Sequence, residues 1–203
     1  ASNDKNLVLS KKLLDETIGF RGPDYQSNIV SYKGWNVYHA RLSIISIEET
    51  ANQPIIDDHG LTLFNGEIFN YVELAEKYKI SANYSDTLVL SKLLSIPEFS
   101  FHELDGFFSI VKIDEQGTLT HCLRDKFGVK PLFYHEKNSI LSIASELNIL
   151  VDLYNLDVNQ NAITDYKIFR APMVEASYYE GLSSVAPGAC KISGTYFNLL
   201  ETF

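Results

Sequence analysis

Three polar stretches of the sequence carry side chains that together could hold an amino acid. Arg41 lies within the otherwise apolar stretch 37–47, and a guanidinium beside a core suits a bidentate grip on a carboxylate. Asp86 stands at the expected start of a helix, where its carboxylate could receive an α-amine. Asn65 and Gly66 could add a side-chain amide and a backbone N–H, the pair of donors that an oxyanion needs.

Each of these residues also has a purely structural interpretation. Arg41 could form an ion pair with Asp125 or Glu146. Asp86 could simply neighbour a helix N-cap. The pair Asn65-Gly66 could be a polar turn between a strand and a helix, because both residue types tolerate positive φ. Taken one by one, the residues leave both interpretations open.

The histidines and cysteines indicate no second kind of chemistry. The five histidines lie in different segments with no metal-ligand spacing: His39, His59, His102, His121 and His135. We expect His39 to pack within a strand, and His59 and His135 to lie solvated in turns. Cys122 and Cys190 stand among apolar residues, so we expect them in the core rather than as nucleophiles.

The composition is that of a globular protein of one large domain or two small ones, with 203 residues, 45% hydrophobic and 21% charged. The net charge of -9 argues against a nucleic-acid surface. No apolar run approaches the roughly 20 residues of a membrane span, and no signal-peptide pattern opens the chain. A reducing, cytoplasmic setting is therefore the expectation.

Hydrophobic periodicity and turn residues predict an α+β protein with helices packed on antiparallel sheets. Helices are expected over 7–20, 71–77 and 87–94, with a short one ending at Leu150. Strands are expected over 28–32, 35–42, 55–56, 61–64, 107–113, 119–123 and 140–144, with a last hairpin near 188–197.

Residues 7 to 200 resemble the N-terminal glutamine amidotransferase domain of asparagine synthetases and their relatives. Nine motifs carry the resemblance, in the order of that family: RGPD (21–24), HARLSI (39–44), QP (53–54), NGEIFN (65–70), SD (85–86), LDGFF (104–108), RDKFGVKPL (124–132), ASE (144–146) and VAPG (185–188). A single motif would be a weak signal, whereas nine in order are specific.

The resemblance implies an N-terminal-nucleophile hydrolase fold, an αββα sandwich of two antiparallel sheets between helical layers. It implies hydrolysis of L-glutamine to glutamate and ammonia by an N-terminal cysteine whose own α-amine acts as the base. It also implies a role for each site residue: Arg41 for the substrate carboxylate, Asp86 and Glu67 for its α-amine, Asn65 and the Gly66 N–H as oxyanion hole, and backbone groups around Leu42 and Ile44 as pocket lining.

The resemblance further implies a partner, a C-terminal synthetase domain that uses the ammonia to amidate aspartate or another carboxylate. ATP and Mg²⁺ would belong to that domain, because no Ser-Gly-Gly-x-Asp-like phosphate loop occurs before Phe203, and the glutaminase domain itself needs no cofactor. Homodimer formation is left open.

The start of the chain departs from the family pattern. The family begins with a cysteine and a short buried strand, whereas here Ala1 is followed by the polar residues 2–6. We therefore expect residues 1–203 to be a glutaminase domain without its N-terminal strand and nucleophile, inactive and either poorly stable or self-associating alone. Two explanations stay open: the sequence is truncated, in which case Ala1-Ser2 could be the tail of that strand, or the domain has lost glutaminase chemistry naturally. The alternative function is a catalytically silent docking or glutamine-binding module.

Overall fold

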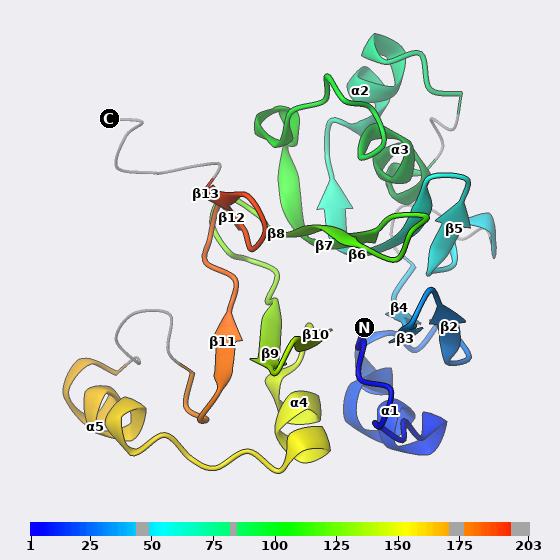
Figure 1. Cartoon of the computed structure of the whole chain (residues 1–203). Coiled ribbons are helices and arrows are strands. Elements are labelled where there is room, and N and C mark those ends of the chain that lie inside the picture. The colour runs from blue at the N-terminus through cyan, green and yellow to red at the C-terminus, as the bar shows by residue number, and fades with distance from the viewer. Residues whose placement is uncertain (44–48, 82–84, 171–176, 196–203) are drawn as a thin grey trace.

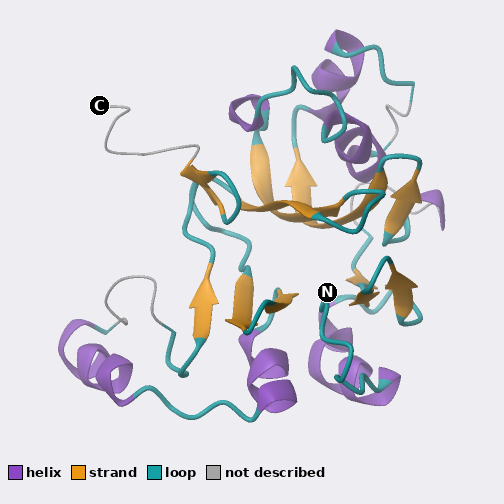
Figure 2. Cartoon of the chain, in the orientation of Figure 1, coloured by secondary structure: helices purple, strands orange, loops and turns teal. Residues whose placement is uncertain are grey.

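The computed structural model describes residues 1–43, 49–81, 85–170 and 177–195. It consists of two antiparallel sheets packed face to face between two layers of helices (Figure 1, Figure 2). Three clusters of buried side chains fill the spaces between these four layers. The predicted αββα sandwich is confirmed. Within the described residues, no helix is both long and apolar enough to cross a membrane.

The larger sheet has six strands in the order β13-β12-β8-β7-β6-β5. They are β5 (Ile55–Asp57), β6 (Gly60–Ile68), β7 (Gly106–Ile113), β8 (Leu119–Arg124), β12 (Ala189–Cys190) and β13 (Gly194–Thr195). Helices α2 (Tyr71–Lys77) and α3 (Asp86–Leu93) cover its outer face (Figure 1). Phe64, Ile68 and Phe108 pack there against Leu90 of α3, and such burial contributes about 25 cal/mol per Å² of apolar area.

The second sheet is built from two groups of strands. In one group β2 (Val30–Tyr32) pairs with β3 (Trp35–Val37); in the other β9 (Phe133–Lys137) lies between β10 (Ile140–Ala144) and β11 (Leu182–Ser184). Helices α1 (Lys11–Ile18) and α4 (Leu147–Tyr154) cover its outer face through Leu14, Ile149 and Leu150. The remaining elements are β1 (Tyr25–Gln26), β4 (Ala40–Arg41), α5 (Gln160–Phe169) and the 3-10 turns Gly19–Arg21, Glu49–Ala51 and Phe101–Glu103.

The N-terminal residues join the two groups of the second sheet. Ser2 is paired antiparallel with Asn36 of β3 on one side and with Ser142 of β10 on the other. The Ser2 N–H donates to the Asn36 carbonyl at 2.9 Å, and the Ile143 N–H donates to the Ala1 carbonyl at 2.8 Å. Residues 1–3 thus lie between β3 and β10, in a central position of the second sheet.

A buried polar network fixes this segment in place. The Ser142 hydroxyl donates to Ser2 Oγ at 2.6 Å and lies 2.6 Å from the Tyr154 hydroxyl of α4. Ser2 is 4% exposed and Asp4 is 8% exposed, so these hydrogen bonds are made away from water, where they hold geometry well.

Most expected elements are confirmed, and the errors have physical reasons. The helix at 71–77 is found as predicted, and the helix expected at 87–94 runs from Asp86 to Leu93. The helix expected over 7–20 is limited to 11–18. Helix α5 was not predicted, because its apolar side chains are spread around it; Ile168 and Phe169 are exposed.

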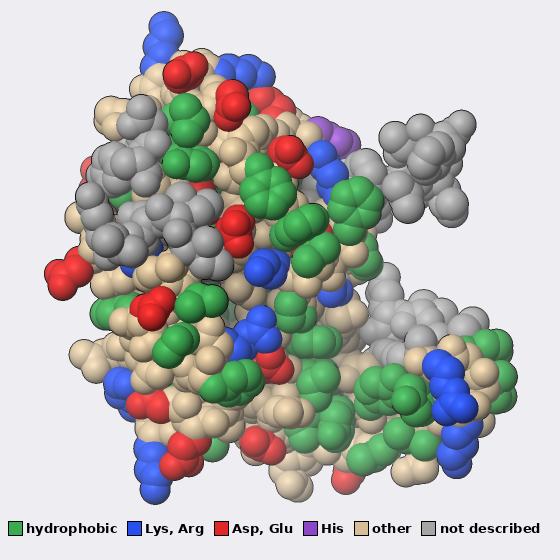
Figure 3. Space-filling view, turned by 180° about the vertical axis from the view of Figure 1, so that it is seen from behind, with side chains coloured by type: hydrophobic (Ala, Val, Ile, Leu, Met, Phe, Trp, Pro, Cys, Tyr) green, Lys and Arg blue, Asp and Glu red, His purple; other side chains and the backbone are tan. Residues whose placement is uncertain are grey.

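One surface of the protein mixes both signs of charge. On the face shown in Figure 3, acidic and basic side chains are interspersed among hydrophobic ones. The described residues of this face therefore form no clustered basic surface of the kind that binds a phosphate backbone.

Candidate active site

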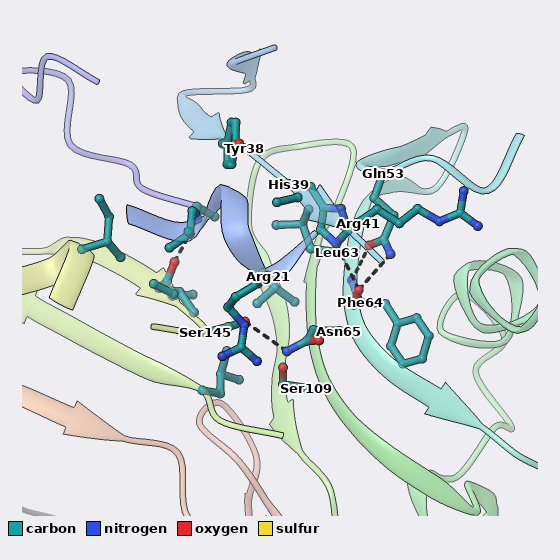
Figure 4. A pocket seen from close by; sticks show the side chains of 18 of the residues that line it. Arg21, Tyr38, His39, Arg41, Gln53, Leu63, Phe64, Asn65, Ser109 and Ser145 are labelled. Carbon is teal, nitrogen blue, oxygen red and sulfur yellow. Dashed lines mark hydrogen bonds between the residues drawn. The ribbon is translucent and has the colours of Figure 1, made fainter. Parts of the chain in front are cut away.

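A cavity of about 290 Å³ brings together the predicted site residues that the structure describes. Its lining includes Arg41, Leu42, Asn65, Gly66, Glu67 and Asp86. Ile44, which was expected beside them, lies outside the described residues. Figure 4 shows the part of the cavity around β6, with Asn65 and Ser145 on one side and Arg41, His39 and Gln53 on the other.

Pairing with β7 determines which way the backbone of β6 faces. Asn65 is opposite Ser109, and Gly66 is opposite Phe108. Phe108 directs its own N–H and carbonyl to Asp125 on the far side. Because antiparallel pairs alternate, Asn65–Ser109 is a hydrogen-bonded pair and the Gly66 N–H points away from β7.

On the side of β6 that faces away from β7, backbone groups of every second residue form hydrogen bonds, with one exception. The Phe64 backbone is bonded to Gln53, and the Ile68 N–H donates to Asp86 Oδ2 at 3.2 Å. Between them, no described residue accepts the N–H of Gly66. An extended strand therefore presents one unused backbone donor to the cavity, as an oxyanion site requires.

The position of Gly66 corrects the expected turn. Asn65-Gly66 lies inside strand β6, which continues to Ile68, rather than between a strand and a helix. Gly66 has φ of 148°, and a Cβ added there would lie 1.9 Å from the Phe107 carbonyl oxygen. A glycine is required because the β7 backbone approaches closely, so the sequence signal was genuine but the turn interpretation was wrong.

Asn65 lies on the face of β6 that looks toward the second sheet. Its Nδ2 donates to Ser145 Oγ at 3.4 Å, a long hydrogen bond to a residue just beyond β10 (Figure 4). The side-chain amide is therefore held at the cavity by a weak contact that a substrate oxygen could replace.

Arg41 is 8% exposed and ends the short strand β4, which pairs with Tyr25 of β1. Its Nη1 donates to Asn52 Oδ1 at 2.8 Å. The side chain extends away from Asn65, so the cation and the amide mark opposite ends of the site (Figure 4). The two acids considered as structural partners are otherwise engaged: Glu146 binds Arg21, and Asp125 accepts backbone N–H groups, among them those of Phe108 and Lys130.

Asp86 is the first residue of α3 and is 5% exposed. The neighbouring Ser85 is the N-cap, since its Oγ accepts from the Leu88 N–H at 3.5 Å. Burial raises the pKa of Asp86 above its ordinary value, although hydrogen bonds from the Ile68 and Thr87 N–H groups oppose that shift. A buried acid of this kind favours the arrival of a cation.

Several lining residues were not predicted as site residues, although they belong to the quoted motifs: Arg21, His39, Gln53, Lys130 and Ser145. Gln53 and His39 both contact the Phe64 carbonyl, which no local pattern could indicate. His135, expected in solvent, is 6% exposed and contacts the Gly181 carbonyl at 2.8 Å, so that prediction was wrong.

Neither cysteine lines the cavity, and both are buried, as expected. Burial raises the pKa of the Cys122 thiol to about 12, which leaves almost no thiolate near neutral pH. The described residues contain no group of three or more His, Cys, Asp or Glu side chains that could hold a metal ion.

The N-terminal segment leads to the same cavity, which both Ala1 and Ser2 line. Because Ser2 is antiparallel to Asn36 and to Ser142, a residue placed ahead of Ala1 on the same line would lie opposite Tyr38 and Ala144. Tyr38 and Ala144 also line the cavity.

Comparison with known proteins matches residues 2–198 to the family model of the glutamine amidotransferase domain. A glutamine-hydrolyzing asparagine synthetase of Bacillus subtilis is 28% identical over 187 residues, covering 88% of this chain and 29% of that protein. A second one from that organism is 33% identical over 144 residues, covering 68% of this chain and 19% of that protein. A solved structure of Bacillus subtilis glutamine phosphoribosylpyrophosphate amidotransferase aligns with 74% of this chain and 31% of its own, at a TM-score of 0.49 and 19% identity. The chain spans about a third or less of the length of these relatives.

Proposed function

Since this chain belongs to the glutamine amidotransferase domain family, with asparagine synthetases among its relatives, we propose that its cavity binds L-glutamine for hydrolysis to L-glutamate and ammonia. One observation carries the proposal: a buried cation, a buried acid and two amide donors, one of them held only by a long hydrogen bond, line a single cavity. These are Arg41, Asp86, and Asn65 with the Gly66 N–H.

The substrate is bound by its amino-acid head. Arg41 receives the α-carboxylate, because a guanidinium offers two parallel donors to a carboxylate. Asp86, with Glu67 nearby in the lining, receives the α-ammonium. Leu42 lines the same end of the cavity. The side-chain amide of the bound glutamine then lies toward Asn65, because the Arg41 side chain, which binds the other end of the substrate, extends away from Asn65.

The reacting group is the side-chain carboxamide. A thiolate attacks the carbonyl carbon, and the carbonyl oxygen becomes an oxyanion that accepts hydrogen bonds from Asn65 Nδ2 and the Gly66 N–H. The C–N bond breaks, ammonia leaves with the proton that the base had taken from the thiol, and water then hydrolyses the thioester to glutamate. Each oxyanion donor is worth about 10²–10³ in kcat.

The nucleophile in this proposal is a cysteine on the line of the N-terminal segment, ahead of Ala1, with its own α-amine as base. Cys122 and Cys190 are excluded because neither lines the cavity. The antiparallel register of Ser2 supports the assignment, because it directs such a residue between Tyr38 and Ala144.

For the whole protein, the proposal includes an ATP- and Mg²⁺-dependent domain that transfers the ammonia to aspartate or another carboxylate. Its support is the short span of this chain along asparagine synthetases. No residue described here is assigned to ATP, Mg²⁺ or the acceptor.

A second candidate function is glutamine binding without turnover, which needs only the groups that hold the substrate; none of the described residues that line the cavity is a cysteine. Two measurements separate the functions. Calorimetric titration should give binding of L-glutamine by the full-length protein and much weaker binding of D-glutamine, because inversion at Cα exchanges the groups offered to Arg41 and Asp86. Enzymatic assay of glutamate then decides between turnover and binding alone. Absence of any glutamine binding by the folded protein would refute both functions.

A further inference from the structure

Gln53 forms a two-point contact with the backbone of a single residue, Phe64. Its Nε2 donates to the Phe64 carbonyl at 2.8 Å, and its Oε1 accepts from the Phe64 N–H at 2.6 Å. Gln53 is 4% exposed, so both hydrogen bonds are shielded from water. The side-chain amide thus substitutes for a neighbouring strand where β5, whose pairing ends at Ile55–Thr62, no longer covers β6.

His39 brings a second donor to the same carbonyl. Its Nε2 lies 3.3 Å from the Phe64 oxygen, and because a carbonyl can only accept, that nitrogen carries the proton. Its other ring nitrogen, Nδ1, is buried and has no partner among the described residues. Desolvation lowers the pKa of His39 to about 4, and the nearby Arg41 guanidinium acts in the same direction. His39 is therefore a neutral donor at physiological pH.

We propose that His39 and Gln53 are positioning residues for the oxyanion donors: by donating together to the Phe64 carbonyl, they fix the Phe64–Asn65 peptide and thereby the Asn65 amide and the Gly66 N–H. This inference rests on the proposed hydrolysis of glutamine. The inference adds to the proposed hydrolysis two residues that influence the reaction only through the backbone of β6.

The geometry explains why two donors are needed. The β7 ladder holds Asn65 from one side, but Gly66 has no Cβ and an unusual φ of 148°. Without the contacts of Gln53 and His39 with the Phe64 backbone, β6 could twist near Gly66 on the side that faces away from β7. A twist of the peptide moves the Gly66 N–H off the oxyanion, and displacement by about 1 Å can cost about 10²-fold in rate.

The contact of Nε2 also excludes the usual role of an active-site histidine. A general base needs an available nitrogen of matched pKa facing the substrate proton. The Nε2 of His39 is committed to Phe64, so His39 acts as a fixed donor rather than as a proton carrier.

The test compares three substitutions in the full-length protein with its natural N-terminus. His39→Phe keeps the ring size and removes the donor. His39→Gln replaces the donor at a similar reach from Cβ. His39, which was expected within a strand, lies between β3 and β4. His121→Phe is the control, since His121 of β8 is likewise half-buried but does not line the cavity.

We expect His39→Phe to lower kcat for glutamine hydrolysis about 10- to 100-fold with KM within about twofold, and His39→Gln to restore most of kcat. His121→Phe should leave both unchanged. Unchanged kcat in His39→Phe overturns the proposal. So does an equal loss of kcat and affinity that His39→Gln does not repair, because it would mean that His39 contacts the substrate.

A second readout is independent of turnover. Hydrogen exchange of the peptide covering 61–68 should quicken about tenfold in His39→Phe and return in His39→Gln. If the wild-type protein hydrolyses no glutamine, the proposed function fails, and this exchange alone decides the positioning role: unchanged exchange in His39→Phe overturns it.

Discussion

Gly66→Ala is the substitution whose cost follows most directly from the geometry. A Cβ at residue 66 would lie 1.9 Å from the Phe107 carbonyl oxygen and 2.7 Å from Phe108 Cα. A normal contact is about 3.5 Å, so β6 and β7 would have to separate by about 1.5 Å at this point. Both atoms belong to backbone in the middle of the larger sheet, so no side-chain rotation relieves the contact.

The expected loss of stability combines two costs. Holding alanine at a φ of 148° costs about 1–3 kcal/mol. Separating the strands weakens the two hydrogen bonds of the Asn65–Ser109 pair, each worth about 1 kcal/mol. A total of about 4 kcal/mol lowers Tm by roughly 8–16 °C in a protein of this size.

Gly34→Ala provides the matched control. Gly34 also has positive φ, 89°, but a Cβ added there would meet nothing within 4 Å. It therefore carries the conformational cost without the clash, and about 1 kcal/mol of loss is expected. Thermal unfolding of the three proteins gives the comparison. Equal destabilisation by the two alanines would refute the close approach of β7 to Gly66.

Three further predictions concern charge. Arg41→Gln should raise Kd for L-glutamine at least about 100-fold, measured by calorimetry, whereas Arg170→Gln should leave it unchanged, because Arg170 is the exposed C-cap residue of α5. Asp86→Asn should abolish binding with little change in Tm, because removal of a buried charge whose pKa is raised offsets the loss of one of the two N–H hydrogen bonds that the carboxylate accepts. Wild-type affinity should fall on acidification at a higher pH than an ordinary aspartate would give, and an unchanged affinity of Asp86→Asn would exclude this role. Lys112→Met should stabilise the protein by about 1–2 kcal/mol in urea unfolding, because the buried Lys112 Nζ has no hydrogen-bond partner in the described part of the chain. Its ion pair with Asp57 is long, at 3.8 Å, and after the substitution Asp57 still has Lys92 at 3.2 Å. Burial lowers the pKa of Lys112, so this gain should shrink as pH rises from that lowered pKa toward the ordinary value near 10.4, and a gain that grows with pH would contradict it.

Local sequence signals predicted the fold well wherever pattern and packing agree. The apolar run of β7 is buried from Phe108 to Ile113, as its pattern indicated. Helix α2 forms where it was predicted, but it buries Leu74 and Ala75 and leaves Val72, which was expected on the apolar face, exposed. Asn65-Gly66 misled the turn prediction because the same glycine preference arises from a close backbone approach across a sheet. Helix α5 was not predicted because its sequence places no continuous apolar stripe on one face.

The same distinction between local signals and long-range packing separates the site residues that the sequence predicted from those that it did not. Arg41, Asp86, Glu67 and Asn65-Gly66 were found because each residue type has a chemical use that the sequence displays. Gln53 and His39 were not, because their importance depends on a shared partner, Phe64, that is 11 and 25 residues away along the chain. Contacts of that range are set by the packing of the sheet and have no local signature.

The central claim, that the cavity hydrolyses glutamine, is tested most directly by measuring glutamate and ammonia released from L-glutamine by the full-length protein with its natural N-terminus. The account predicts equimolar release that Arg41→Gln suppresses at low substrate and that Asn65→Ala lowers in kcat by about 10²–10³. A folded protein that binds L-glutamine but releases neither product would contradict hydrolysis and leave a glutamine-binding module in its place.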